Sequence, residues 1–161
     1  IMKKIIVYIV ITLFVSNCVN NQTADELYSS AEAARNEKNV KSALSNLELL
    51  LKKYPDHNLA AKTQYLIGDI FMNDLRDFNS AINAYNNVVE KFSGTSQEAQ
   101  AQFMIGYIYA NILGNKIEAE KNYNTFLEKY PDHELAPSVK FELDYLGKDI
   151  NEIDVLKHIT S

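Results

Sequence analysis

The chain has 161 residues, of which 47% are hydrophobic and 23% are charged, so it can bury a core and is not intrinsically disordered. Its formal net charge is −5 at pH 7, and removing residues 1–17, which hold two lysines and no acidic residue, lowers it to −7. Such an acidic body repels phosphate backbones, which excludes nucleic acid as the expected partner.

The N-terminal segment has the pattern of a signal peptide. Lys3 and Lys4 precede a predominantly apolar run over residues 5–15, and the chain turns polar from Ser16 onward. The run has the length of a signal-peptide core and falls short of the roughly 20 residues that span a bilayer as a helix. We therefore predict a signal peptide at residues 1–17 and a linker at residues 18–24.

Cys18 is the only cysteine, so an intrachain disulfide is excluded. One interpretation is an unmodified thiol. The other rests on a resemblance: the sequence Val-Ser-Asn-Cys at residues 15–18 resembles a bacterial lipobox, although Asn17 replaces the usual Gly, Ala or Ser. That resemblance implies that Cys18 is lipidated and anchors the protein to a membrane. Val19, which is not the aspartate associated with inner-membrane retention, favours the outer membrane, with the protein facing the periplasm.

The rest of the chain is built from an internal repeat of 38 residues. Residues 65–96 align without a gap with residues 103–134, pairing Gly68 with Gly106 and Tyr85 with Tyr123. The repeat predicts units at about 25–56, 57–94 and 95–132, a closing helix at 133–147 and a tail at 148–161, because solenoids need an atypical element to cover the last apolar face. In the first unit, the same spacing gives these equivalent residues: Ser30, Ala33, Ala43, Leu47, Leu50, Tyr54 and Pro55.

Each unit is predicted to contain two helices, because apolar residues recur at spacings of three and four in both of its halves. A residue suited to capping a helix N-terminus precedes each second helix, and these residues are Asn39, Asp77 and Asn115. Proline ends the second helix in the first and third units, since it disfavours helix in the residue before it. Small residues at repeated positions predict close contact between the two helices of a unit; they are Ala43, Ala81, Ala119, Gly68 and Gly106.

The order of small, aromatic and apolar residues resembles the tetratricopeptide repeat. The third unit reads Ile105-Gly106, Tyr109, Ala119, Tyr123, Phe126 and Pro131, and the second unit follows the same order. The period exceeds the roughly 34 residues of that family, with one extra residue between Phe71 and Ala81, and Gln64 and Gln102 stand where an aromatic residue is usual. The resemblance implies an all-α solenoid of three antiparallel helix pairs plus a C-terminal closing helix.

The resemblance also implies a concave groove, lined by first helices, that binds a protein or peptide segment. Tyr65, Phe103 and Phe141 share one position of the repeat. This aromatic ladder either packs as core between neighbouring first helices or holds a helix or extended peptide. The groove positions are Leu27, Ala31 and Ala34, then Lys62, Tyr65, Asp69 and Met72, then Gln100, Phe103, Tyr107 and Ala110, and finally Phe141 and Tyr145.

No motif of a hydrolase, a metalloenzyme or a nucleotide-binding protein occurs in the sequence. His57 and His133 recur with the repeat, which indicates a structural role. We therefore predict no catalytic residue, metal, cofactor or small-molecule substrate, and a non-catalytic scaffold for protein–protein interaction. The chain resembles the BamD-like lipoproteins, which assist outer-membrane protein assembly with about five repeats. Alternatives are a pilotin-type lipoprotein, a Tol-Pal-associated adaptor resembling YbgF and, more distantly, an enzyme of unknown type.

Overall fold

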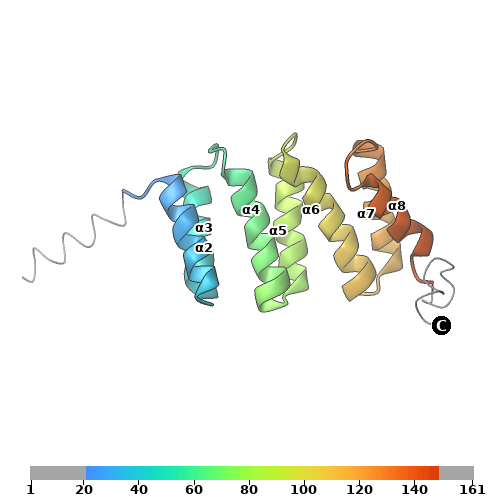
Figure 1. The fold of residues 1–161 in the computed structure, drawn as a ribbon, viewed down its shortest axis with the longest axis horizontal. Coiled ribbons are helices and arrows are strands. Elements are labelled where there is room, and N and C mark those ends of the chain that lie inside the picture. Colours follow the sequence, from blue (N-terminus) through green and yellow to red (C-terminus); the bar gives the residue numbers. More distant parts are fainter. Residues whose placement is uncertain (1–20, 149–161) are drawn as a thin grey trace, which may run out of the picture. The chain divides into compact units, whose positions relative to one another are not determined.

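The computed structural model describes residues 21–148, which form helices joined by short turns and contain no strand (Figure 1). The chain divides into two compact units, residues 1–60 and residues 61–161, and each is considered by itself. Within the described residues, no helix has the length and apolarity needed to cross a membrane. The predicted signal peptide, Cys18 and the part of the tail after Lys148 lie outside the described residues.

The first unit is a pair of helices, α2 (Ala24–Asn36) and α3 (Val40–Lys53). Helix α2 begins inside the predicted linker with a full capping box: Thr23 Oγ1 accepts from Glu26 N at 3.2 Å, and Thr23 N donates to the Glu26 carboxylate at 2.9 Å. The cap predicted at Asn39 is confirmed, because its side chain accepts from Ser42 N at 3.2 Å. The equivalent residues predicted in the second helix are buried as expected; they are Ala43, Leu47 and Leu50.

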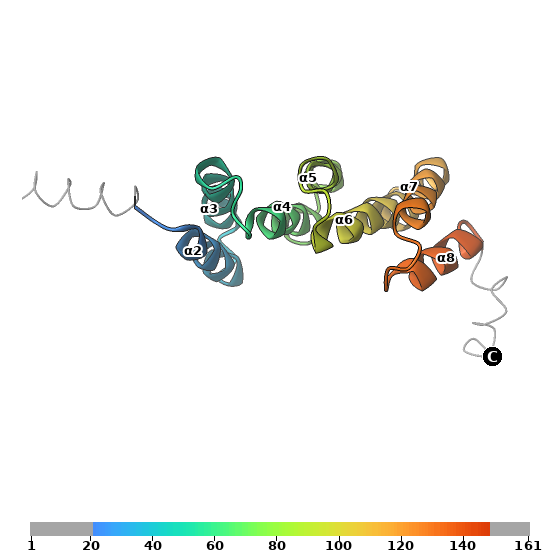
Figure 2. The same cartoon turned by 90° about the horizontal axis from the view of Figure 1, so that it is seen from above.

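The second unit repeats the pair twice and adds one helix. Its elements are α4 (Ala60–Asp69), the π-helix η1 (Ile70–Leu75), α5 (Phe78–Lys91), α6 (Ser96–Tyr107), the π-helix η2 (Ile108–Ile112), α7 (Lys116–Lys129) and α8 (Ala136–Tyr145). Seen from above, α5 and α7 lie on one side of this unit and α4, α6 and α8 on the other (Figure 2). Asp77 and Asn115 cap α5 and α7 as predicted, by accepting from Ser80 N and Glu118 N.

Glycine lets the two helices of each pair in the second unit approach closely. A Cβ atom on Gly68 would lie 2.5 Å from Cε1 of Tyr85, and one on Gly106 would lie 2.6 Å from Cδ1 of Tyr123. Both tyrosines are fully buried, as are Ala81 and its repeat equivalents. The predicted role of the repeated small residues is thereby confirmed.

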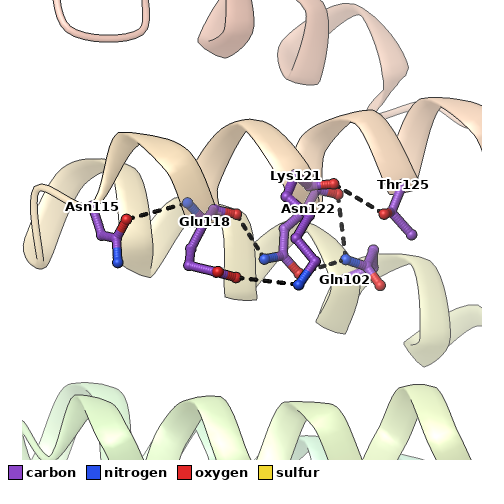
Figure 3. Close-up of polar contacts among 6 residues, drawn as sticks. All are labelled: Gln102, Asn115, Glu118, Lys121, Asn122 and Thr125. Atoms are coloured by element: carbon purple, nitrogen blue, oxygen red, sulfur yellow. Dashed lines mark hydrogen bonds and ion pairs between the residues drawn. The ribbon is translucent and has the colours of Figure 1, made fainter.

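The two glutamines that replace the usual aromatic residue tie the first helix to the second. Gln64 Nε2 donates to the Ala84 carbonyl at 3.1 Å, and Gln102 Nε2 donates to the Asn122 carbonyl at 3.3 Å and to Asn122 Oδ1 at 2.9 Å (Figure 3). Ala84 and Asn122 are equivalent in the repeat. At this position of the repeat, a side-chain hydrogen bond to the backbone of the second helix therefore replaces aromatic packing.

The extra residue of the long repeat lies in the π-helical ends of the first helices. Asp77 N donates to the Phe71 carbonyl, six residues back, at 2.8 Å, and Asn115 N does the same with Tyr109. Helix α2 has no such segment, and Asn39 N reaches only five residues back, to the Ala34 carbonyl. Equivalent residues in the first helices of the first and second repeat units are therefore 37 residues apart, and not 38.

This offset corrects the sequence alignment of the first helix in the first unit. Leu27, Ala31 and Ala34 correspond to Gln64, Gly68 and Phe71, the side that packs on the second helix of the same pair. All three are buried, so the groove positions predicted there are wrong. The predicted equivalents Ser30 and Ala33 are also wrong, since Ser30 is only half-buried and Ala33 is exposed.

Candidate functional site

The ten remaining groove residues lie on the first helices, on their π-helical ends and on α8 of the second unit. Lys62 and Phe141 are exposed and the other eight are half-buried, so this face is open to solvent in part. The residues come from five elements: Lys62, Tyr65 and Asp69 from α4; Met72 from η1; Gln100, Phe103 and Tyr107 from α6; Ala110 from η2; Phe141 and Tyr145 from α8.

Two of the three rings of the aromatic ladder, those of Tyr65 and Phe103, rest on the second helices. The Tyr65 ring lies 5.2 Å from the Tyr85 ring, and the Phe103 ring lies 6.2 Å from the Tyr123 ring, measured between centroids. Because Tyr85 and Tyr123 are fully buried, each ladder ring has a fixed support behind it and a solvent-facing part in front. Phe141, which is 44% exposed, instead pairs with Tyr145 on its own helix at 4.5 Å.

Carboxylates on the same elements hold the buried tyrosines. The Tyr85 hydroxyl donates to Asp69 Oδ1 at 2.6 Å, and the Tyr123 hydroxyl donates to Glu142 Oε2 at 3.3 Å. Burial and then the Asp69 charge raise the pKa of Tyr65 to about 12. Burial, followed by the Glu142 charge, raises the pKa of Tyr123 as well. These phenols therefore stay protonated at neutral pH and act as packing groups and hydrogen-bond donors.

An open cleft of about 510 Å³ lies where the first helices end. Both π-helical segments contribute to it, together with the turn and the first residue of α5 that follow η1. The lining residues are Met72, Asn73, Arg76, Phe78, Asn111 and Ile112. Only Met72 belongs to the predicted groove, so the cleft is a site that the sequence analysis missed.

The repeated histidines have a structural role, as predicted. His57 Nδ1 accepts from Leu59 N at 3.2 Å, and His133 Nδ1 accepts from Leu135 N at 3.1 Å. Each ring thus fixes the turn that leads into the next helix. Among residues 21–148, no group of three or more His, Cys, Asp or Glu side chains is placed to hold a metal ion.

A family model described as outer membrane lipoprotein, YfiO, matches residues 20–155. The chain belongs to the YfiO family. Membership makes the protein an outer membrane lipoprotein of the bacterial envelope and confirms the resemblance to the BamD-like proteins. No curated protein matches the chain.

Two local features of this YfiO-family chain had a signal in the sequence that the analysis did not use. The Thr-x-x-Glu pattern at Thr23 and Glu26 is that of a capping box and would have placed the start of α2 correctly. Arg76 lies at a left-handed turn position, with a φ of 55°, where Gly114 lies in the next repeat with a φ of 63°. The alignment of Arg76 with Gly114, directly before the predicted caps, was therefore a signal for a left-handed turn position.

Proposed function

We propose that this protein is a non-catalytic scaffold that is anchored through acyl chains on Cys18 and binds a peptide segment of another protein on its first helices. In this proposal residues 1–17 are a cleaved signal peptide. Residues 25–147 are a tetratricopeptide-type array in which α8 closes the series of helix pairs. The YfiO family match supports the lipoprotein and scaffold character, and outer-membrane protein assembly is the process that we infer for it.

The observation that supports the binding face best is the aromatic ladder. Tyr65 and Phe103 are half-buried, and each is backed by a fully buried tyrosine that glycine allows to come close. A ring held from behind loses little conformational entropy when a partner covers its front. Rigid aromatic side chains of this kind are common anchors at protein interfaces.

The lipid anchor is tested by metabolic labelling with an alkyne fatty acid, followed by membrane fractionation. We expect the wild-type chain to carry label and to sediment with outer membranes, and Cys18→Ala to lose both properties. Asn17→Gly is the matched control, because it brings the lipobox closer to the usual pattern and should keep the label. Equal labelling of Cys18→Ala and wild type would exclude this site.

The binding face is tested by crosslinking in cells and identification of the co-purified proteins. We expect Phe103→Ala to lose the crosslinked partner and to keep its helical circular dichroism signal, while Asn83→Ala, at an exposed position of α5, keeps both. Recovery of barrel-assembly components with the wild-type chain would support the assembly role, whereas a secretin would indicate a pilotin. Unfolding of Phe103→Ala would show that the ring serves the core.

A further inference from the structure

The cleft between η1 and η2 has one charged group in its lining, the Arg76 guanidinium. In the described part of the chain this guanidinium makes no hydrogen bond or ion pair. The neighbouring Asp77 does not neutralise it, because both carboxylate oxygens of Asp77 accept from Ser80, at 3.1 and 2.7 Å. A protein with a net charge of −5 thus presents an unpaired cation in a concave site. This favours a carboxylate-bearing occupant.

The lining of the cleft is half apolar and half polar, and large apolar side chains follow it in the sequence. Met72, Phe78 and Ile112 line the cleft. Leu75 and Leu113, at equivalent positions of the two repeats, are 46% and 42% exposed, and Ile117 at the start of α7 is 79% exposed. Leu75 and Leu113 directly adjoin lining residues in the sequence, Arg76 and Ile112, and exposed apolar side chains beside a cleft are typical of an interaction site.

One feature of the backbone favours a function other than folding. The extra residue in each π segment rotates the last turn by about 100° relative to a regular helix, which has 3.6 residues per turn. Both segments line the cleft, and π insertions are frequent at functional sites.

We propose that this cleft binds an extended segment of a partner protein in which an Asp or Glu lies next to large apolar residues. The carboxylate pairs with Arg76, and the apolar neighbours lie against Met72, Phe78 and Ile112. The volume of about 510 Å³ suits a few side chains and is too small for a whole helix. This goes beyond the ladder-based function, because the cleft shares only Met72 with the predicted groove.

The experiment uses the full chain, solubilised in detergent, to select from a phage library of internally displayed random heptapeptides. We expect enrichment of peptides with one acidic residue flanked by large apolar residues. Arg76→Gly should weaken the binding of a selected peptide on the order of tenfold, because it removes the charged partner. The backbone at this position favours glycine, so the variant should fold at least as well as wild type.

Lys38→Gly is the matched control, since Lys38 occupies the same left-handed turn position in the first unit with a φ of 61°. It should leave peptide affinity unchanged. The proposal is overturned if no peptide is enriched, if enriched peptides show no acidic preference, or if Arg76→Gly binds them as tightly as wild type. It is also overturned if the chain forms a dimer that Arg76→Gly abolishes, because the occupant would then be a second copy.

Discussion

The close packing of Gly68 on Tyr85 leads to a specific prediction for Gly68→Ala. The new methyl group would lie 2.5 Å from Tyr85 Cε1, so the ring must move by about 1 Å to reach ordinary van der Waals contact. The ring is fully buried and its hydroxyl is held by Asp69 at 2.6 Å, so this movement strains the core and the hydrogen bond together.

The expected cost follows from three contributions. Overpacking of a core costs about 1–3 kcal/mol, and a hydrogen bond to a charged group contributes about 1.5–3 kcal/mol. Alanine regains about 1 kcal/mol of helix propensity relative to glycine. The net loss is about 3 kcal/mol, which corresponds to a fall in the melting temperature of roughly 12–24 °C for a unit of this size. Gly106→Ala should lower the free energy of unfolding by less, about 2 kcal/mol. The hydrogen bond from the Tyr123 hydroxyl to Glu142 is longer, at 3.3 Å, so less stability is lost when the ring moves.

The measurement is thermal and urea unfolding followed by circular dichroism. A double-mutant cycle with Tyr85→Leu isolates the clash, because the smaller side chain makes room for the methyl group and should restore at least about 1 kcal/mol. Asn83→Ala, at an exposed position of α5, is the control and should stay within about 0.5 kcal/mol of wild type. If Gly68→Ala melts at or above the wild-type temperature, glycine is not required for the approach of the two helices.

Three further changes test the core and its polar groups. Ala81→Leu should lower the melting temperature by several degrees, because Ala81 is fully buried between the helices of its pair. Thr63→Val should raise the free energy of unfolding in urea by about 1 kcal/mol, since the buried Thr63 hydroxyl has no hydrogen-bond partner. Burial raises the pKa of Glu98, but the Gly94 N–H bond at 2.7 Å and other partners outweigh it and hold the pKa below its usual value. The stability that Glu98 contributes is thus complete above its unfolded-state pKa of about 4.3 and is lost as the pH falls through the lower folded pKa, a dependence that Glu98→Gln should remove.

The sequence predicted the second helices and their caps correctly because these depend on local signals. Asn39, Asp77 and Asn115 each accept from a backbone N–H three residues on, as the capping pattern requires. The ends of α3 and α7 lie at Lys53 and Lys129, directly before the Tyr-Pro pairs. Such features involve neighbouring residues only, so they need no knowledge of the packing.

The first helices were less predictable because their register depends on backbone hydrogen bonds that leave no clear pattern. An extra residue between Phe71 and Ala81 could lengthen the turn or enter the helix as a π segment, and only the structure shows the second outcome. Because α2 lacks the extra residue, a spacing of 38 residues aligns its residues one position wrongly. Leu27 is the equivalent of Gln64, and not of Tyr65. The bond from Gln102 to the Asn122 carbonyl was equally hidden, since it requires the second helix at a particular distance.

The two surfaces of the second unit follow from one feature of the repeat. Tyr65 lies in the regular α-helical part of the first helix, which ends at Asp69, and its ring packs against Tyr85. The aromatic ladder is therefore a surface of the α-helical part of the first helices. Beyond Asp69 the π segment redirects the last turn, so the side chains of Asn73 and Arg76 line a separate cleft. A regular helix of the same length would continue the first face and leave no second one. The four extra residues of the repeat over the usual period of about 34 therefore do more than lengthen loops: one of them enters the first helix as a π segment whose residues line the proposed binding cleft.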